Sequence, residues 1–165
     1  MRLIDTAAEL YAHAMAIERE AAERYAELAE RMQDKGEEDL ARVFGLLARM
    51  EAEHLETLQR RTRGVELPAI EQGKYNWLDS GAPETAAREL VFRLLTPRKA
   101  LAIALHAEKR AQAFFEHVYW TAFDPALRAL AKEMAAEERE HVDLVTGMLD
   151  ETPEGSLDNT LIFQK

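Results

Sequence analysis

Apolar residues recur along most of this chain at spacings of three and four positions, which places them on one face of an α-helix. The first such stripe follows Thr6, which forms a capping-box pattern with Glu9, and it continues to Met32. A second stripe spans residues 37–61 and ends before Gly64, a typical stop signal. The alternating pattern of a strand does not compete with these helices.

Two more long helices are predicted in the second half of the chain, and each begins with a capping residue followed by a proline. Thr96 precedes a helix that we expect over residues 97–122. Asp124 precedes another that we expect over residues 125–150. Within each half a short turn joins the two helices, which favours antiparallel neighbours.

The two halves are joined by a long connection, residues 63–96, which reads as a loop followed by a short helix near residues 84–95. Two antiparallel helix hairpins joined by one long crossover are typical of the ferritin-like four-helix bundle. We therefore predict an all-α bundle over residues 1–150 and an extended C-terminal tail over residues 151–165.

Composition narrows the classes of function. The formal net charge of −10 argues against nucleic acid as a partner, because phosphate binding needs clustered Lys and Arg. The chain has no cysteine, which excludes disulfides, thiolate catalysis, iron–sulfur clusters and Cys-ligated zinc. Asp5 and Glu9 stand where a signal peptide needs an apolar run, and no stretch has the ~20 apolar residues of a membrane span. We expect a cytoplasmic protein with no membrane partner.

The two predicted hairpins resemble each other in sequence. When the first helix is aligned with the third, Glu18 falls on Glu108. When the second helix is aligned with the fourth, two Glu-x-x-His motifs coincide, Glu51–His54 and Glu138–His141. The pattern indicates a duplicated hairpin in which each half carries the same three ionisable groups.

These six residues are candidates for one site. A Glu and a His three positions apart point the same way from a helix. At ~1.5 Å per residue, each trio lies ~25 Å along the bundle from the turn of its own hairpin. The six groups are therefore expected to meet midway along the bundle.

Four carboxylates gathered in a bundle core are costly unless they are protonated or balanced by cations. Two divalent metal ions would balance four negative charges while both imidazoles stay neutral. Carboxylate and imidazole donors without sulfur suit iron or manganese, whereas zinc fits the donors but has no redox chemistry. One Glu-x-x-His motif arises easily by chance on a solvated helix. Two motifs in register with matched Glu partners favour a metal centre over a purely structural polar layer.

Other ionisable residues near the motifs are less well placed. Glu137 lies four residues before His141, but its counterpart in the first hairpin is Met50, so the duplication favours Glu138 as the ligand. Glu20 is matched by an arginine in the second hairpin, so Glu18 is preferred. Five further candidates turn away from the ligand face and are expected at the surface or behind the ligands: Glu53, Glu140, His13, His106 and His117.

Tyr25 lies seven residues after Glu18 and therefore nearly on the same helix face. It is a candidate catalytic residue, either through a hydrogen bond near the metals or as an electron relay. The alternative is simple packing, which is the only role open to its counterpart Phe115. Trp77 and Trp120 are expected to be packing residues.

The sequence resembles a known family across essentially all of residues 5–150. The phrase at residues 18–25 followed by Glu51-x-x-His54 is similar to the first hairpin of the rubrerythrin branch of the ferritin-like superfamily. Glu108 followed by Glu138-x-x-His141 is similar to the second hairpin. The resemblance implies that all six residues are di-iron ligands, with both Glu of the two motifs bridging the metals and each His terminal on one of them.

The chain also departs from that family. Rubrerythrins carry a further Glu three residues after the ligand of the third helix, and Ala111 stands there in this chain. Many rubrerythrins also carry a Cys-rich rubredoxin domain, and these 165 residues contain no cysteine. The remaining donors resemble the symmetric set of bacterioferritin, but we see no extra helix suited to building a storage cage.

We therefore expect a protein with two iron ions that reduces hydrogen peroxide or O2, as a peroxidase, ferroxidase or oxidase. The electrons would come from an external donor or from Fe(II) itself. Two alternatives stay open: a non-catalytic iron-binding or iron-delivery protein, and a metal-free scaffold. The family resemblance also suggests a homodimer.

Overall fold

The structure is a computed structural model and describes residues 3–70 and 95–153. Within these residues the chain forms four α-helices and no strand. The helices are α1 (Ala7–Asp34), α2 (Glu38–Arg61), α4 (Pro97–Thr121) and α5 (Pro125–Glu151). The prediction of an all-α fold with four long helices is confirmed, and the boundaries differ from the predicted ones by at most two residues.

The helices begin where the capping residues predict. The hydroxyls of Thr6 and Thr96 each accept a hydrogen bond from the backbone N–H three residues further on, at 3.1 and 3.2 Å. The Asp124 carboxylate accepts from two successive backbone N–H groups at 2.7 and 3.0 Å. Helix α2 has no such side-chain cap and follows a tight turn in which Gly36 has a φ of 76°. Glycine adopts this left-handed conformation without the steric cost that other residues meet.

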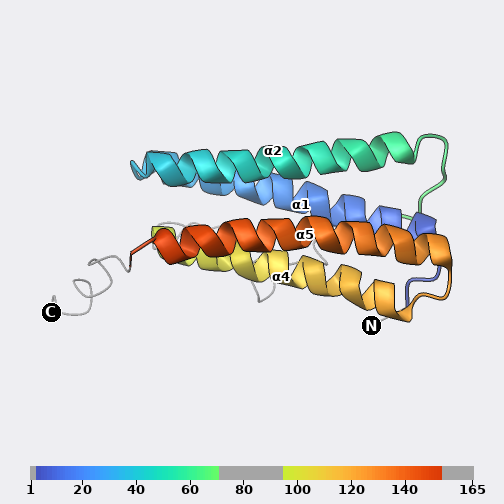
Figure 1. Cartoon of the computed structure of the whole chain (residues 1–165). Coiled ribbons are helices and arrows are strands. Elements are labelled where there is room, and N and C mark those ends of the chain that lie inside the picture. The colour runs from blue at the N-terminus through green and yellow to red at the C-terminus, as the bar shows by residue number, and fades with distance from the viewer. Residues whose placement is uncertain (1–2, 71–94, 154–165) are drawn as a thin grey trace, which may run out of the picture.

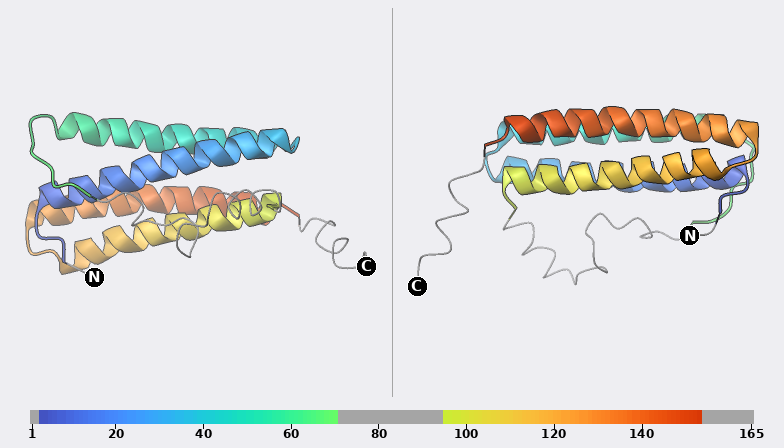
Figure 2. Two further views of the ribbon diagram at one scale, coloured as in Figure 1. Left: turned by 180° about the vertical axis from the view of Figure 1, so that it is seen from behind. Right: turned by 60° about the horizontal axis from the view of Figure 1, so that its bottom comes forward.

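The four helices form two antiparallel hairpins. Helix α1 packs along α2 and α4 packs along α5, and the two hairpin turns lie at opposite ends of the bundle (Figure 1). The further views show the helices in a two-by-two arrangement (Figure 2). Across the interface between the hairpins, α1 contacts both α5 and α4. This arrangement is that of the predicted ferritin-like bundle.

Part of the predicted connection and tail falls outside the described residues. Residues 65–70, after α2, have no regular secondary structure. The predicted short helix near residues 84–95 lies outside the described residues except for Leu95, and Trp77 and the tail from residue 154 onward lie outside them too. No helix among the described residues is both long and apolar enough to span a membrane.

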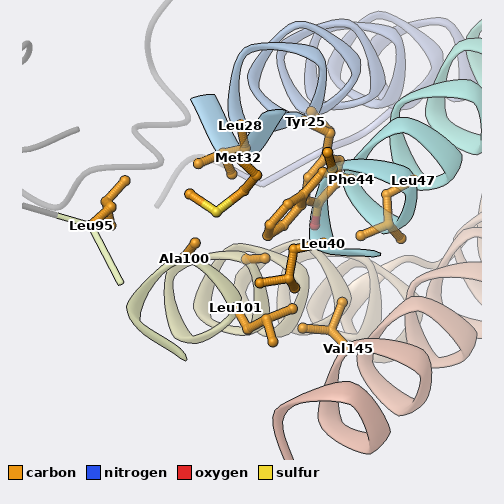
Figure 3. Packing of buried hydrophobic residues seen from close by; sticks show 13 residues of the cluster. Tyr25, Leu28, Met32, Leu40, Phe44, Leu47, Leu95, Ala100, Leu101 and Val145 are labelled. Atoms are coloured by element: carbon orange, nitrogen blue, oxygen red, sulfur yellow. The ribbon is translucent and has the colours of Figure 1, made fainter. Parts of the chain in front are cut away.

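The buried apolar side chains form two separate clusters, one toward each end of the bundle. The first cluster lies toward the α1–α2 turn and is built around Tyr25, Phe44 and Leu101 (Figure 3). The second lies toward the α4–α5 turn and is built around Leu10 and Phe115. The middle of the bundle, between these clusters, is where the ionisable residues of the helices lie.

Candidate metal centre

The six predicted ligands lie in one polar layer between the two apolar clusters. On α1, Ile17 belongs to one cluster and Ala21 to the other, and Glu18 stands between them. On α2, Leu47 and Leu58 flank the Glu-x-x-His motif in the same way. The layer is therefore closed by apolar packing toward both ends of the bundle.

Burial is nearly complete for most of the layer. Five members are at most 3% exposed: Glu18, Glu51, Glu108, Glu138 and His141. The exception is His54, whose side chain is 25% exposed, against 1% for the equivalent His141. The layer thus has one side sealed in the bundle and one side that reaches toward solvent.

His141 brings together carboxylates from three helices. Its Nδ1 lies 2.9 Å from Oε1 of Glu51 on α2 and 3.4 Å from Oε2 of Glu108 on α4. Oε2 of Glu138, on the same helix as the histidine, is 3.8 Å away. The second hairpin trio is therefore assembled, and Glu51 of the first hairpin reaches into it.

His54 occupies the corresponding place in the first hairpin. Its Nδ1 lies 3.6 Å from Oε2 of Glu18 and 3.9 Å from Oε2 of Glu51. The rings of His54 and His141 are stacked, with centroids 5.2 Å apart and planes 6° from parallel. Glu51 thus has one oxygen near each histidine and lies between the two trios.

Several of these atoms are close without being hydrogen-bonded. Both oxygens of Glu18 are buried without a hydrogen-bond partner, and so are the Nδ1 atoms of His54 and His141. Oε1 of Glu51 also lacks one, because its short approach to His141 does not have hydrogen-bond alignment. Buried polar groups are normally hydrogen-bonded, so such a set needs an explanation. Donors that converge without satisfying each other suit an ion placed among them.

The structure groups the donors into three sets that can each hold a metal ion. The atoms of each set lie within 4.8 Å of one another: Glu51, His54 and His141; Glu108, Glu138 and His141; and Glu18, His54 and Glu137. The third set contains Glu137. The sequence had favoured Glu138 over this residue, because the counterpart of Glu137 in the first hairpin is Met50. The signal for Glu137 was its spacing of four residues from His141, which keeps both residues on one helix face.

Tyr25 is tied directly to the polar layer. Its hydroxyl donates a hydrogen bond to Oε1 of Glu108, and the side chain is fully buried. Its ring also packs against Phe44, with centroids 6.1 Å apart. Tyr25 therefore makes the predicted hydrogen bond beside the candidate ligands and packs in the apolar core as well.

Burial raises the pKa of two carboxyls in the layer. For Glu18 the loss of hydration comes first and the neighbouring Glu51 adds to it, so its pKa lies well above the usual 4.5. For Glu138 the loss of hydration is followed by repulsion from Glu108, with the same direction. Without a cation, both groups therefore favour the protonated, uncharged form.

The other two shifts come from the contact between Glu51 and His141. Burial alone would raise the pKa of Glu51, but its contacts with His141 and Glu18 and the charges of both histidines together outweigh burial and lower the pKa. Burial favours the neutral ring of His141, yet Glu108 and Glu51 raise its pKa to about 11. In the absence of metal the site thus stores protons that metal binding must displace.

The remaining predicted residues lie away from the layer. Glu53, Glu140, His106 and His117 are exposed, as expected for groups that turn away from the ligand face. His13 is half-buried beside Phe114, with ring centroids 5.7 Å apart. The prediction that Trp120 packs is wrong, since the residue is 74% exposed at the last turn of α4.

The donor set passes a chemical test for metal binding. It contains only carboxylate oxygens and imidazole nitrogens, the donors that suit iron, manganese and zinc. Several of these atoms are buried and unpartnered, as ligands without their ion would be. The residues present therefore fit a metal centre.

Comparison with known proteins points the same way. The chain matches the family model for rubrerythrin over residues 9–149. Among solved structures it is similar to an uncharacterised conserved protein from Magnetospirillum magnetotacticum MS-1, with 36% sequence identity and a TM-score of 0.80. That similarity covers 92% of this chain and 98% of the other. No curated protein gave a significant match. The match supports the ferritin-like bundle over nearly the whole chain.

Proposed function

Because the chain belongs to the rubrerythrin family, we propose that its polar layer holds two iron ions and that the protein is an oxidoreductase that reduces hydrogen peroxide or O2 there. The single observation that carries this proposal is the set of buried, unpartnered carboxylate and imidazole atoms midway along the bundle. Protonation can remove the charge of such a carboxylate and let it share a hydrogen bond with its neighbour, as Glu18 would with Glu51. Metal ions would balance the charge and bind the carboxylate oxygens and imidazole nitrogens together.

The three donor sets suggest how the ligands would be shared. Glu18 and His54 would bind one ion, while Glu108 and His141 would bind the other. Glu51, with an oxygen near each histidine, would bridge the two ions. Glu138 is the equivalent residue in the second hairpin, and we assign it the second bridge.

Bound iron would supply the redox electrons and the Lewis acidity for reducing the oxidant. The chain's own residues provide the surroundings. The two apolar clusters keep water away from the layer along the bundle axis. The Tyr25 hydroxyl orients Glu108 and carries a proton at Oη beside it. The partly exposed His54 lies on the side from which a small oxidant would reach the layer.

Other parts of the proposal concern the partners. The chain has no cysteine to store electrons, so the reductant would be another protein or a small molecule, or Fe(II) itself as in a ferroxidase. We also propose a homodimer in the cytoplasm, as the family resemblance suggests. Size-exclusion chromatography with light scattering tests the dimer directly.

A second candidate function is non-catalytic iron binding or delivery. It is favoured by one observation, the partial exposure of His54 and Glu137, which leaves one side of the layer open for an ion to depart. An iron-delivery protein would take up and release Fe(II) without repeated redox cycles.

Elemental analysis and rapid kinetics test these candidates. Protein purified from iron-replete cells should contain about two iron ions per chain, as the charge of four carboxylates requires. The Fe(II)-loaded protein is then mixed with peroxide or O2, with and without an electron donor. Fast, repeated turnover with the donor supports the enzyme, and a single slow oxidation supports the binding protein. Protein that takes up no metal from any solution tested rules out both.

A further inference from the structure

Glu137 stands immediately before Glu138 on α5, yet its carboxylate reaches the half of the centre that belongs to the first hairpin. Its ligand oxygen lies within 4.8 Å of those of Glu18 and His54. We propose that Glu137 is a metal ligand that completes, with Glu18 and His54, one of the two metal positions. The inference rests on the proposed two-metal centre and adds a seventh donor to it.

The neighbours of Glu137 independently indicate a cation at this point. Glu18 is 0% exposed, and neither of its carboxylate oxygens has a hydrogen-bond partner. The Nδ1 of His54, 3.6 Å from Oε2 of Glu18, is also unpartnered. A buried carboxylate with no donor needs a proton or a cation, and Glu137 is the third donor around the same point.

The donor set that contains Glu137 has the same composition as the set around His141. The first trio is Glu18, His54 and Glu137, and the second trio is Glu108, Glu138 and His141. Each trio has two carboxylates and one imidazole, and Glu51 lies between them. The duplicated motifs already give each hairpin two carboxylates and one imidazole. Glu137 is therefore an additional donor on the side of Glu18 and His54, with no equivalent on the other side.

Glu133, one helical turn before Glu137, behaves differently. It is exposed and forms an ion pair with Arg61 at 2.6 Å. Glu137 is half-buried and forms no ion pair with any other described residue. Arg61 and the two histidines attract the charge of Glu137 from a distance, but no cation in the described part of the chain forms an ion pair with it. A partly buried carboxylate of this kind is suited to bind a metal ion, whereas Glu133 is already paired with Arg61.

Glu137 also makes the two metal positions unequal. Its counterpart in the first hairpin is Met50, whose thioether is a poor ligand for iron or manganese compared with a carboxylate. The first trio is open to solvent at His54 and Glu137, while the second trio is buried throughout. A fifth carboxylate also leaves one negative charge uncompensated by two divalent ions. This charge favours the oxidised metals and lowers the reduction potential of the centre.

Titration with Co(II) tests the assignment without relying on activity. Metal-free wild-type protein, E137Q and E140Q are titrated anaerobically and followed by calorimetry and by the visible absorption of bound Co(II). E140Q is the matched control, because Glu140 is an exposed acid on the same helix. We expect two Co(II) ions in the wild type and in E140Q. In E137Q one of the two ions should bind about tenfold more weakly, or worse.

Two further measurements make the outcome decisive. Circular dichroism checks that E137Q, which keeps the size of the side chain, retains its helix content. In the iron-loaded proteins, the reduction potential should be higher in E137Q than in E140Q. Two Co(II) ions bound by E137Q with wild-type affinities would overturn the role of Glu137 and leave the two-metal centre intact. Wild-type protein that binds neither Co(II) nor Fe(II) would overturn the proposed function as well.

Discussion

The Tyr25 hydroxyl on α1 donates a hydrogen bond to Oε1 of Glu108 on α4, so the two hairpins are linked inside the polar layer. Both residues are buried, and neither lies in a Glu-x-x-His motif. The link connects the apolar core around Phe44 to a candidate ligand of the other hairpin. Removing this hydrogen bond should therefore affect the free energy of unfolding and the turnover, which are measured in separate experiments.

Tyr25→Phe should cost about 1–3 kcal/mol of the free energy of unfolding, because it leaves a buried carboxylate without its donor. A phenylalanine ring should fit at position 25, since Phe115 occupies the equivalent position of the second hairpin. Urea denaturation measures the loss, with Tyr119→Phe, half-buried outside the layer, as the control. Metal content should stay unchanged while turnover with peroxide falls. If Tyr25→Phe turns over peroxide as fast as Tyr119→Phe, Tyr25 has no catalytic role and only packs.

Glu51→Ala and Glu138→Ala should both lose metal, because each removes a proposed ligand that both ions share. The controls are Glu53→Ala and Glu140→Ala, which remove exposed acids two residues further along the same helices. Metal content after dialysis against excess Fe(II) or Mn(II) is the measurement. If both bridge variants keep two ions per chain, the ligand assignment is wrong.

The stability of the metal-free protein should fall as pH rises. A raised pKa in the folded state contributes stability at low pH, which is lost as the pH rises through that pKa. Glu18 and Glu138 have pKa values well above 4.5, and that of His141 is about 11, above its usual 6.5. Glu51, whose pKa is lowered, acts in the opposite direction but only at more acid pH.

Chemical denaturation of chelator-treated protein between about pH 5.5 and about pH 8.5 measures this dependence. The free energy of unfolding should decrease across the range, and the slope should be smaller in Glu18→Gln, which removes one of the groups. Saturating metal should reverse the trend, because metal binds the deprotonated ligands more tightly as pH rises. Stability of the metal-free protein that increases across this range would contradict the protonation pattern.

Phe44→Ala should cost about 3–5 kcal/mol, because it opens a cavity in the apolar cluster shown in Figure 3. Phe44 is fully buried and packs against Tyr25. Leu46→Ala, two residues away on the same helix, is the control. Leu46 is 43% exposed, so its loss should change stability by about 0.5 kcal/mol or less. Equal effects of the two substitutions in thermal or urea unfolding would be incompatible with this packing.

Local sequence signals accounted for the helices and for most of the candidate site. Capping residues such as Thr96 and Asp124 act within one helical turn, so they mark a helix start without knowledge of the tertiary structure. The duplication then placed Glu18 and Glu108 at matching heights. Any packing of the two hairpins that buried their apolar faces would bring such groups together.

Two residues lie where local sequence signals do not place them. Glu137 was set aside because Met50 occupies its counterpart, but α5 carries it toward Glu18 and His54 of the other hairpin. No internal symmetry of the sequence contains that information. Trp120 was expected to pack because it is large and apolar. It lies at the last turn of α4, and its helix presents it to solvent.

The matching trios of the two hairpins have a consequence for the origin of the protein. Two copies of one ancestral hairpin, associated about a twofold axis, would already present the same six groups. In such an ancestor each substitution would appear in both copies, so the two ions would be held alike. Joining two such copies into one chain would let each half change alone, which would account for the tyrosine that matches Phe115 and the glutamate that matches Met50. The fused gene could thus specialise one ion for exchange with the surroundings and the other for retention.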